Sequence, residues 1–178
     1  MNGRGRRLGG ALLALAALAA PSGPAMAQQP PRPPLGEATR VRILEDREAI
    51  RELLNAYGAT LDARDFDGFA GLFARDGEYV SGPTTTRGGA AAAAMLKDVM
   101  AKNPMGFREP NFHVFFNEDI RVAGDRATAT SMSLFIVPDD ANAPRAVLMA
   151  RYRDDLVRED GRWKFARRVV GSNIPAPR

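Results

Sequence analysis

The stretch Glu45–Gly82, EDREAIRELLNAYGATLDARDFDGFAGLFARDGEYVSG, decides the fold of this chain. Its first half places apolar side chains on one face of a helix, at Ile50, Leu53, Leu54, Tyr57 and Leu61. After a break at residues 63–64, Asp65 is in position to cap a second, shorter helix. The turn at 75–77 leads into an extended run, 78–81. The spacing predicts a long amphipathic helix, a short helix and a first strand.

The segment before this stretch has the pattern of a cleavable signal peptide. Basic residues near the start are followed by an apolar run, 8–20, and by Ala25-Met26-Ala27, a small-residue cleavage site. The run is shorter than the ~20 residues of a spanning helix, so a retained membrane anchor is the weaker alternative. We therefore expect a signal peptide at 1–27, cleavage after Ala27 and a periplasmic or secreted protein, by general or twin-arginine export. A proline-rich linker, 28–38, follows.

Charge and cysteine content exclude several classes of protein. The net charge is +4, and the predicted signal peptide supplies three of those positive charges, at Arg4, Arg6 and Arg7. The remaining chain is therefore close to neutral, which gives no reason to expect nucleic acid as a partner. With one histidine and no cysteine, the sequence predicts neither a disulfide nor a metal site, and it suggests no cofactor.

The second half of the chain predicts one more helix and a sheet. An alanine-rich helix is expected over 90–102, after a loop at 82–89, and Thr39 is a candidate cap for an early start of the first helix. Two hairpins follow, 111–122 with 127–137 and 145–158 with 162–171. Apolar residues on both faces of 147–150 predict that this strand is central and covered on each side. Helices first and long strands afterwards indicate an α+β roll.

Several motifs resemble the SnoaL-like branch of the nuclear transport factor 2-like (NTF2-like) superfamily. They are Tyr57, Asp62, DFD at 65–67, LFARDG at 72–77, HVFFNEDIRVAGDRATA from His113, YRDDLVR at 152–158 and DGRWKF at 160–165. The resemblance implies a cone-shaped α+β roll over 39–174, with three N-terminal helices on a strongly curved antiparallel or mixed sheet around an apolar pocket. It also implies a homodimer or homotrimer.

Members of that family that resemble scytalone dehydratase or hexachlorocyclohexane dehydrochlorinase pair a histidine with an aspartate, and these positions match His113 and Asp62. A neutral imidazole can accept a proton near neutral pH, and a carboxylate on its other nitrogen fixes the tautomer. Periodicity, however, places Asp62 roughly 120° from the centre of the apolar stripe, at the helix flank. A solvated Asp62 and a core histidine that only packs are the structural alternatives.

Other side chains are candidates for the same pocket. Alternation places His113, Phe115 and Asn117 on one face of their strand, and the other face is also apolar, which predicts a buried histidine. Tyr57 and Tyr79 could stabilise developing negative charge or simply pack. One of Arg167 and Arg168 should point inward. The candidate catalytic residues are His113, Asp62, Tyr57 and Tyr79, and the candidate substrate-binding residues are Phe115, Asn117, Arg168 and Phe73.

Two functions follow from this pattern. The first is a cofactor-independent lyase or isomerase with dehydratase-type acid–base chemistry on a small apolar, aromatic or polyketide-like molecule. The alternative is a non-catalytic module that binds a small molecule or mediates oligomerisation, because fold alone does not determine function.

Overall fold

The computed structural model describes residues 35–172. The predicted signal peptide, 1–27, and residues 28–34 of the predicted linker lie outside the described residues, as do 173 and 174 at the end of the predicted domain. In the described part of the chain, no helix combines the length and apolar character needed to cross a membrane.

The N-terminal half forms the predicted helices. α1 spans Glu37–Asp62, α2 spans Phe66–Gly71 and α3 spans Gly89–Lys102. Asp65 caps α2 as predicted, because its side chain accepts a hydrogen bond of 2.8 Å from the Gly68 amide. The prediction of Thr39 as the cap of α1 is wrong. The helix begins earlier, and Gly36 precedes it without a side-chain cap.

The strands form one six-stranded mixed sheet within residues 35–172. They are β1 (Phe73–Ser81), β2 (Thr84–Arg87), β3 (Phe112–Ala123), β4 (Arg126–Pro138), β5 (Pro144–Glu159) and β6 (Arg162–Ser172), in the order β2-β1-β6-β5-β4-β3. β1 and β6 are parallel, and the other neighbours are antiparallel. Both predicted hairpins are confirmed, whereas the loop predicted at 82–89 is wrong because it contains β2, which pairs with β1.

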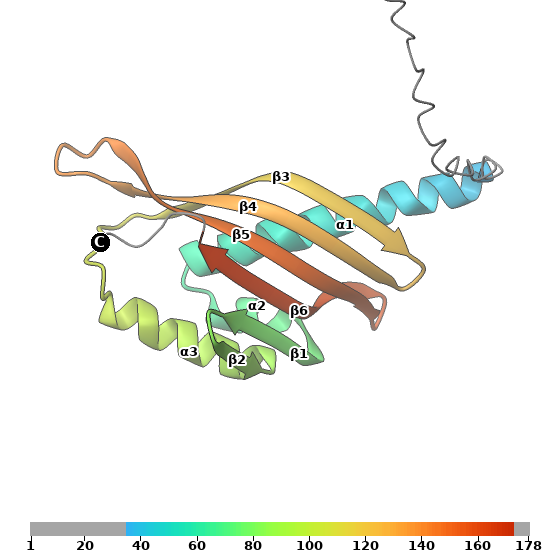
Figure 1. Cartoon of the computed structure of the whole chain (residues 1–178), viewed down its shortest axis with the longest axis horizontal. Helices are drawn as coiled ribbons and strands as arrows, with labels where there is room; N and C mark the ends of the chain where they lie inside the picture. Colours follow the sequence, from blue (N-terminus) through green and yellow to red (C-terminus); the bar gives the residue numbers. More distant parts are fainter. Residues whose placement is uncertain (1–34, 173–178) are drawn as a thin grey trace, which may run out of the picture. The chain divides into compact units, whose positions relative to one another are not determined.

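The helices pack around the sheet as Figure 1 shows: α1 crosses it in contact with β3 and β6, and α3 lies against α2 and β1. The core between them includes Ile50, Leu54, Phe69 and Phe165, which have no exposed surface. Burial of each such side chain contributes about 1.5–3 kcal/mol. The prediction that β5 is central is confirmed, but Val147 and Met149 are only half-buried, so full cover on both faces was wrong.

A glycine in α1 sets the distance between this helix and β3. A Cβ at Gly58 would lie 2.9 Å from the His113 Cβ and 2.9 Å from an edge atom of the Phe115 ring. Glycine therefore allows the last turns of α1 to lie directly against the start of β3, at the cost of a weaker helix former. This close approach brings the end of α1 to His113.

Candidate functional site

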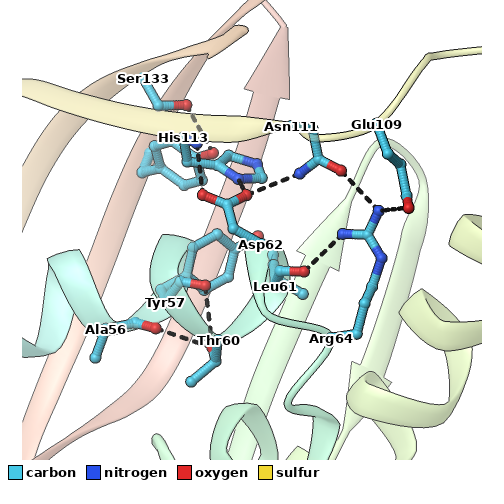
Figure 2. Close-up of polar contacts among 11 residues, drawn as sticks. Ala56, Tyr57, Thr60, Leu61, Asp62, Arg64, Glu109, Asn111, His113 and Ser133 are labelled. Atoms are coloured by element: carbon cyan, nitrogen blue, oxygen red, sulfur yellow. Dashed lines mark hydrogen bonds and ion pairs between the residues drawn. The ribbon is translucent and has the colours of Figure 1, made fainter. Parts of the chain in front are cut away.

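Asp62 and His113 meet where α1 ends and β3 begins. The His113 Nδ1 lies 2.6 Å from Asp62 Oδ1, and the His113 backbone amide donates to Asp62 Oδ2 at 2.7 Å. The two side chains are 12% and 17% exposed, respectively. Periodicity alone placed Asp62 at the solvent-facing flank of the helix. The edge strand β3 covers that flank, so the structure brings the carboxylate to the imidazole (Figure 2).

A chain of polar side chains continues from Asp62 toward the surface. Asn111 Nδ2 donates to Asp62 Oδ1 at 2.9 Å, and Arg64 donates to Asn111 Oδ1 at 2.6 Å. Arg64 also donates to the Leu61 carbonyl at 2.8 Å and forms an ion pair with Glu109. Figure 2 shows these contacts as a continuous network from the imidazole to Glu109.

His113 lines a cavity of about 260 Å³ with mostly apolar walls. Many of the apolar side chains come from α3 and the loop after it, and from the inner face of β4 and β5: Leu96, Val99, Met100, Phe107, Phe135, Leu148 and Ala150. Arg64, Glu109 and Asn111 also line it, whereas Asp62 lies behind the imidazole and does not. The cavity therefore presents one imidazole to an apolar guest, with the carboxylate on the imidazole's far side.

Four hydroxyl groups form a second polar region in the cavity. The Tyr57 and Tyr79 hydroxyls lie 3.4 Å apart, and those of Ser133 and Tyr152 lie 3.0 Å apart. Burial raises the pKa of Tyr79 and of Tyr152, and raises the pKa of Tyr57 well above its usual value. At neutral pH these phenols are therefore protonated and can donate hydrogen bonds to an oxygen of a bound molecule.

The structure places the four candidate substrate-binding residues outside the cavity lining. Phe73 and Phe115 pack in the aromatic core, where Phe73 contacts Phe69 and Phe165, and Phe115 contacts Tyr57 and Tyr152. Asn117 is exposed, because its φ of 53° and a bulge between Phe116 and Asp119 interrupt the alternation of β3. The expectation that it shares the face of His113 was therefore wrong.

Arg168 is the inward-facing member of the arginine pair, and Arg167 is exposed. The Arg168 guanidinium lies behind the cavity wall, among three aromatic rings. It is 4.0 Å from the ring centre of Tyr57, 4.1 Å from that of Tyr152 and 4.5 Å from that of Phe165. Asp154 on β5 is its acidic neighbour, with 3.4 Å between the nearest charged atoms. Arg168 thus supports the tyrosines from behind and does not itself reach a bound molecule.

Sequence reasoning missed several residues of this site. Tyr152 and Ser133 face the cavity from β5 and β4, but only the pairing of those strands shows that their hydroxyls meet. Asn111 and Arg64 belong to a loop and to a helix end, where periodicity gives no direction for a side chain. Alternation contained a usable signal for both: Tyr152 falls on the same face of β5 as Leu148 and Ala150, and Ser133 falls on the same face of β4 as Phe135.

A comparison with protein-family models identifies the family: the SnoaL-like domain matches residues 42–169. The chain belongs to the SnoaL-like family. An NTF2-like protein with a cystatin-like fold from Novosphingobium aromaticivorans is 30% identical to it, with a TM-score of 0.67 over 78% of this chain and 89% of that one. The predicted fold class, an NTF2-like α+β roll, is thereby confirmed.

Two further solved structures that are similar to this SnoaL-like chain carry the names of lyases. A protein from N. aromaticivorans, provisionally named a scytalone dehydratase, is 27% identical, with a TM-score of 0.62 over 76% of this chain and 89% of that one. A hexachlorocyclohexane dehydrochlorinase from Novosphingobium barchaimii shares the fold at 22% identity, with a TM-score of 0.63 over 76% and 91%. Proteins named for elimination reactions are thus among those that share this fold. No curated protein matches the chain.

Proposed function

We propose that this SnoaL-like protein is a cofactor-independent lyase or isomerase in which His113 is the general base and Asp62 orients it. The contact of 2.6 Å between the two side chains, with His113 at the wall of an apolar cavity, is the observation on which the proposal rests. A carboxylate at Nδ1 holds the proton there and leaves Nε2 unprotonated, and it stabilises the imidazolium that forms during the reaction.

The proposed step is removal of a proton from carbon. Nε2 of His113 takes a proton next to a carbonyl or to a carbon bearing a leaving group. In a lyase reaction the C–H electron pair becomes a new C=C bond, and the leaving group departs with its own bonding pair as halide, or as water when it takes up a proton. In an isomerase reaction His113 returns the proton to another carbon of the same molecule.

The cavity hydroxyls would stabilise the charge that this step creates. Removal of a proton next to a carbonyl moves negative charge onto the carbonyl oxygen, and Tyr57 and Tyr79 are protonated donors in the same cavity. Donors aimed at developing charge in a site that excludes water are often the largest contribution to catalysis. The Ser133–Tyr152 pair offers a second position for a substrate or product oxygen.

The substrate class follows from the walls of the cavity. Aliphatic and aromatic side chains form most of the lining, which favours a small apolar or aromatic molecule with one or two oxygen atoms or a halogen. The related proteins named for dehydration and dehydrochlorination support compounds of these two types as the first panel to assay.

The test is exchange of substrate C–H protons in D₂O together with product formation, measured for wild type and His113→Ala. Loss of the base should lower both rates by about 10²–10⁴-fold. Asp62→Asn should lower them as well, while Asn117→Ala, at an exposed position outside the cavity, serves as the matched control. Equal loss of activity and of melting temperature in His113→Ala would favour a structural histidine.

The apolar cavity also supports the alternative, a binding module without chemistry. In that case compounds from the same panel raise the melting temperature and are recovered unchanged, without deuterium, from wild type and His113→Ala alike. The D₂O experiment therefore distinguishes the two functions directly.

We propose in addition that the mature protein is exported and self-associates. The signal-peptide pattern at 1–27 supports export. The outer face of β3 supports association, because Phe112 and Val114 are 54% and 45% exposed there.

A further inference from the structure

The Asp62 carboxylate has its orientation fixed by three donors. The backbone amide of His113 donates to Oδ2, while the His113 ring and the Asn111 side chain both contact Oδ1. The Asn111 amide is the only one of these donors that could turn away without moving β3 or the imidazole. Its orientation therefore determines whether Oδ1 receives one donor or two.

Arg64 fixes the orientation of that amide. An asparagine side chain ends in a donor and an acceptor of nearly the same shape, so a turn of 180° would place Asn111 Oδ1 against Asp62 Oδ1. A guanidinium has donors only, and Arg64 contacts Asn111 Oδ1 at 2.6 Å. Asn111 is buried, so little water is available to replace either partner. With Arg64 in place, the Nδ2 group must face Asp62.

The backbone of Arg64 has an uncommon conformation that makes this contact possible. Its φ is 59°, in the left-handed region where an arginine is disfavoured and glycine or asparagine is tolerated. Such backbone strain is unfavourable and clusters at functional sites. The turn directs the side chain back across the end of α1, where it also donates to the Leu61 carbonyl. The side chain, not the backbone, makes arginine useful at this position.

We propose that Arg64 is a positioning residue that, through Asn111, holds Asp62 in the orientation that keeps the His113 proton on Nδ1. The inference rests on the proposed function of the His113–Asp62 pair. Arg64 touches neither the imidazole nor the carboxylate in the structure, and its effect passes through one amide. Loss of the guanidinium frees Asn111 to turn, weakens the hold on Asp62 Oδ1 and lets the imidazole proton distribute between both ring nitrogens.

The experiment measures that proton directly in the folded protein. His113 is the only histidine in the sequence, so ¹⁵N labelling of untagged protein gives a single pair of ring-nitrogen resonances at high pH. In wild type the two resonances should be widely separated, as expected for a proton kept on Nδ1. In Arg64→Asn, which tolerates the left-handed backbone but cannot reach Asn111, the separation should shrink. Asp62→Asn defines the full size of the change.

Glu109→Gln is the matched control, because it removes the ion pair of Arg64 and leaves the contact between Arg64 and Asn111. Its ring-nitrogen resonances should be those of wild type. Unchanged resonances in Arg64→Asn would overturn the proposal, as would an equal shift in Glu109→Gln, which would assign the effect to the ion pair.

If Arg64→Asn does not fold, Asn111→Ala takes its place, with the same shrinkage expected and unchanged resonances again contradicting the proposal. The measurement needs no substrate. It therefore stands even if the His113–Asp62 pair catalyses no reaction, and an inactive protein would not be mistaken for a wrong inference.

Discussion

Two contacts between a carboxylate and a nitrogen-bearing side chain, His113–Asp62 and Arg168–Asp154, are held in different ways. His113 and Asp62 are slightly exposed, and the Asp62 carboxylate receives donors on both oxygens. The side chains of Arg168 and Asp154 have no exposed surface, and their nearest charged atoms lie 3.4 Å apart; within residues 35–172 neither side chain forms a hydrogen bond. The first contact is fixed by directional hydrogen bonds, as the proposed proton transfer requires. The second is held by charge and by the aromatic rings around the guanidinium.

The two contacts also differ in their position, because only the His113–Asp62 contact borders the cavity. His113 lines the cavity and Asp62 does not, as the proposed role of His113 as a base requires. Arg168 acts from behind the wall, where its charge opposes the rise in the pKa of Tyr57 that burial causes. Rings that face a cation are favourable neighbours for it, by about 2 kcal/mol when water is excluded. The buried arginine is thus part of the support of the tyrosines.

The largest effect on stability is expected when the Arg168–Asp154 contact is broken. Arg168→Met leaves the Asp154 carboxylate buried without its cation, and should lower the free energy of unfolding in urea by about 3–5 kcal/mol. Arg167→Met is the control, since that side chain is 44% exposed and its ion pair with Glu78 lies at the surface. It should cost no more than about 1 kcal/mol.

A second variant separates loss of the pair from loss of packing. In Arg168→Met with Asp154→Leu, no uncompensated charge remains, and most of the lost stability should return. If the two substitutions simply add their separate losses, then Arg168 stabilises the domain through its aromatic contacts, and the contrast between the two pairs is weaker than we infer.

A smaller effect is expected in the pH dependence of stability. Burial raises the pKa of Asp154 from 3.8 to about 6, although the charge of Arg168 works against the rise and that of Asp155 adds to it. Between pH 3.8 and about pH 6, Asp154 therefore keeps a proton in the folded state that it has released in the unfolded state. The contribution of Asp154 to the free energy of unfolding should therefore decrease as pH rises through this interval, by up to about 3 kcal/mol.

The measurement compares urea unfolding of wild type and Asp154→Asn at several values between pH 4 and pH 7. The difference between the two pH profiles isolates Asp154 from the other carboxylates, and it should change through this interval and then level off. Parallel profiles would mean that Arg168 keeps Asp154 ionised throughout, as in an ordinary buried ion pair.

The two contacts also differ in how far the sequence predicts them. The helices, the hairpins and the inward position of one arginine follow from periodicity and alternation, which are local properties. The meeting of Asp62 with His113 was suggested by family motifs and opposed by helical periodicity, because no local rule includes the strand that covers the helix flank. The roles of Asn111 and Arg64 depend on a loop and on a left-handed residue. The exposed position of Asn117 depends on a bulge. The sequence alone indicates none of these local features.

The smallest effect on stability is expected for the close approach of α1 and β3, which brings Asp62 to His113. Gly58→Ala should gain about 1 kcal/mol from helix propensity but place a methyl group 2.9 Å from the His113 Cβ, an overlap that typically costs 1–3 kcal/mol. We expect a net loss of about 1 kcal/mol in urea unfolding and a change in the His113 ring resonances as β3 moves away from Asp62. Gly71→Ala is also a substitution within a helix, but its added Cβ meets nothing within 4 Å, so it should keep any gain from helix propensity and leave the His113 ring resonances unchanged. A stabilised Gly58→Ala protein with wild-type resonances would show that the His113–Asp62 distance does not depend on this close approach.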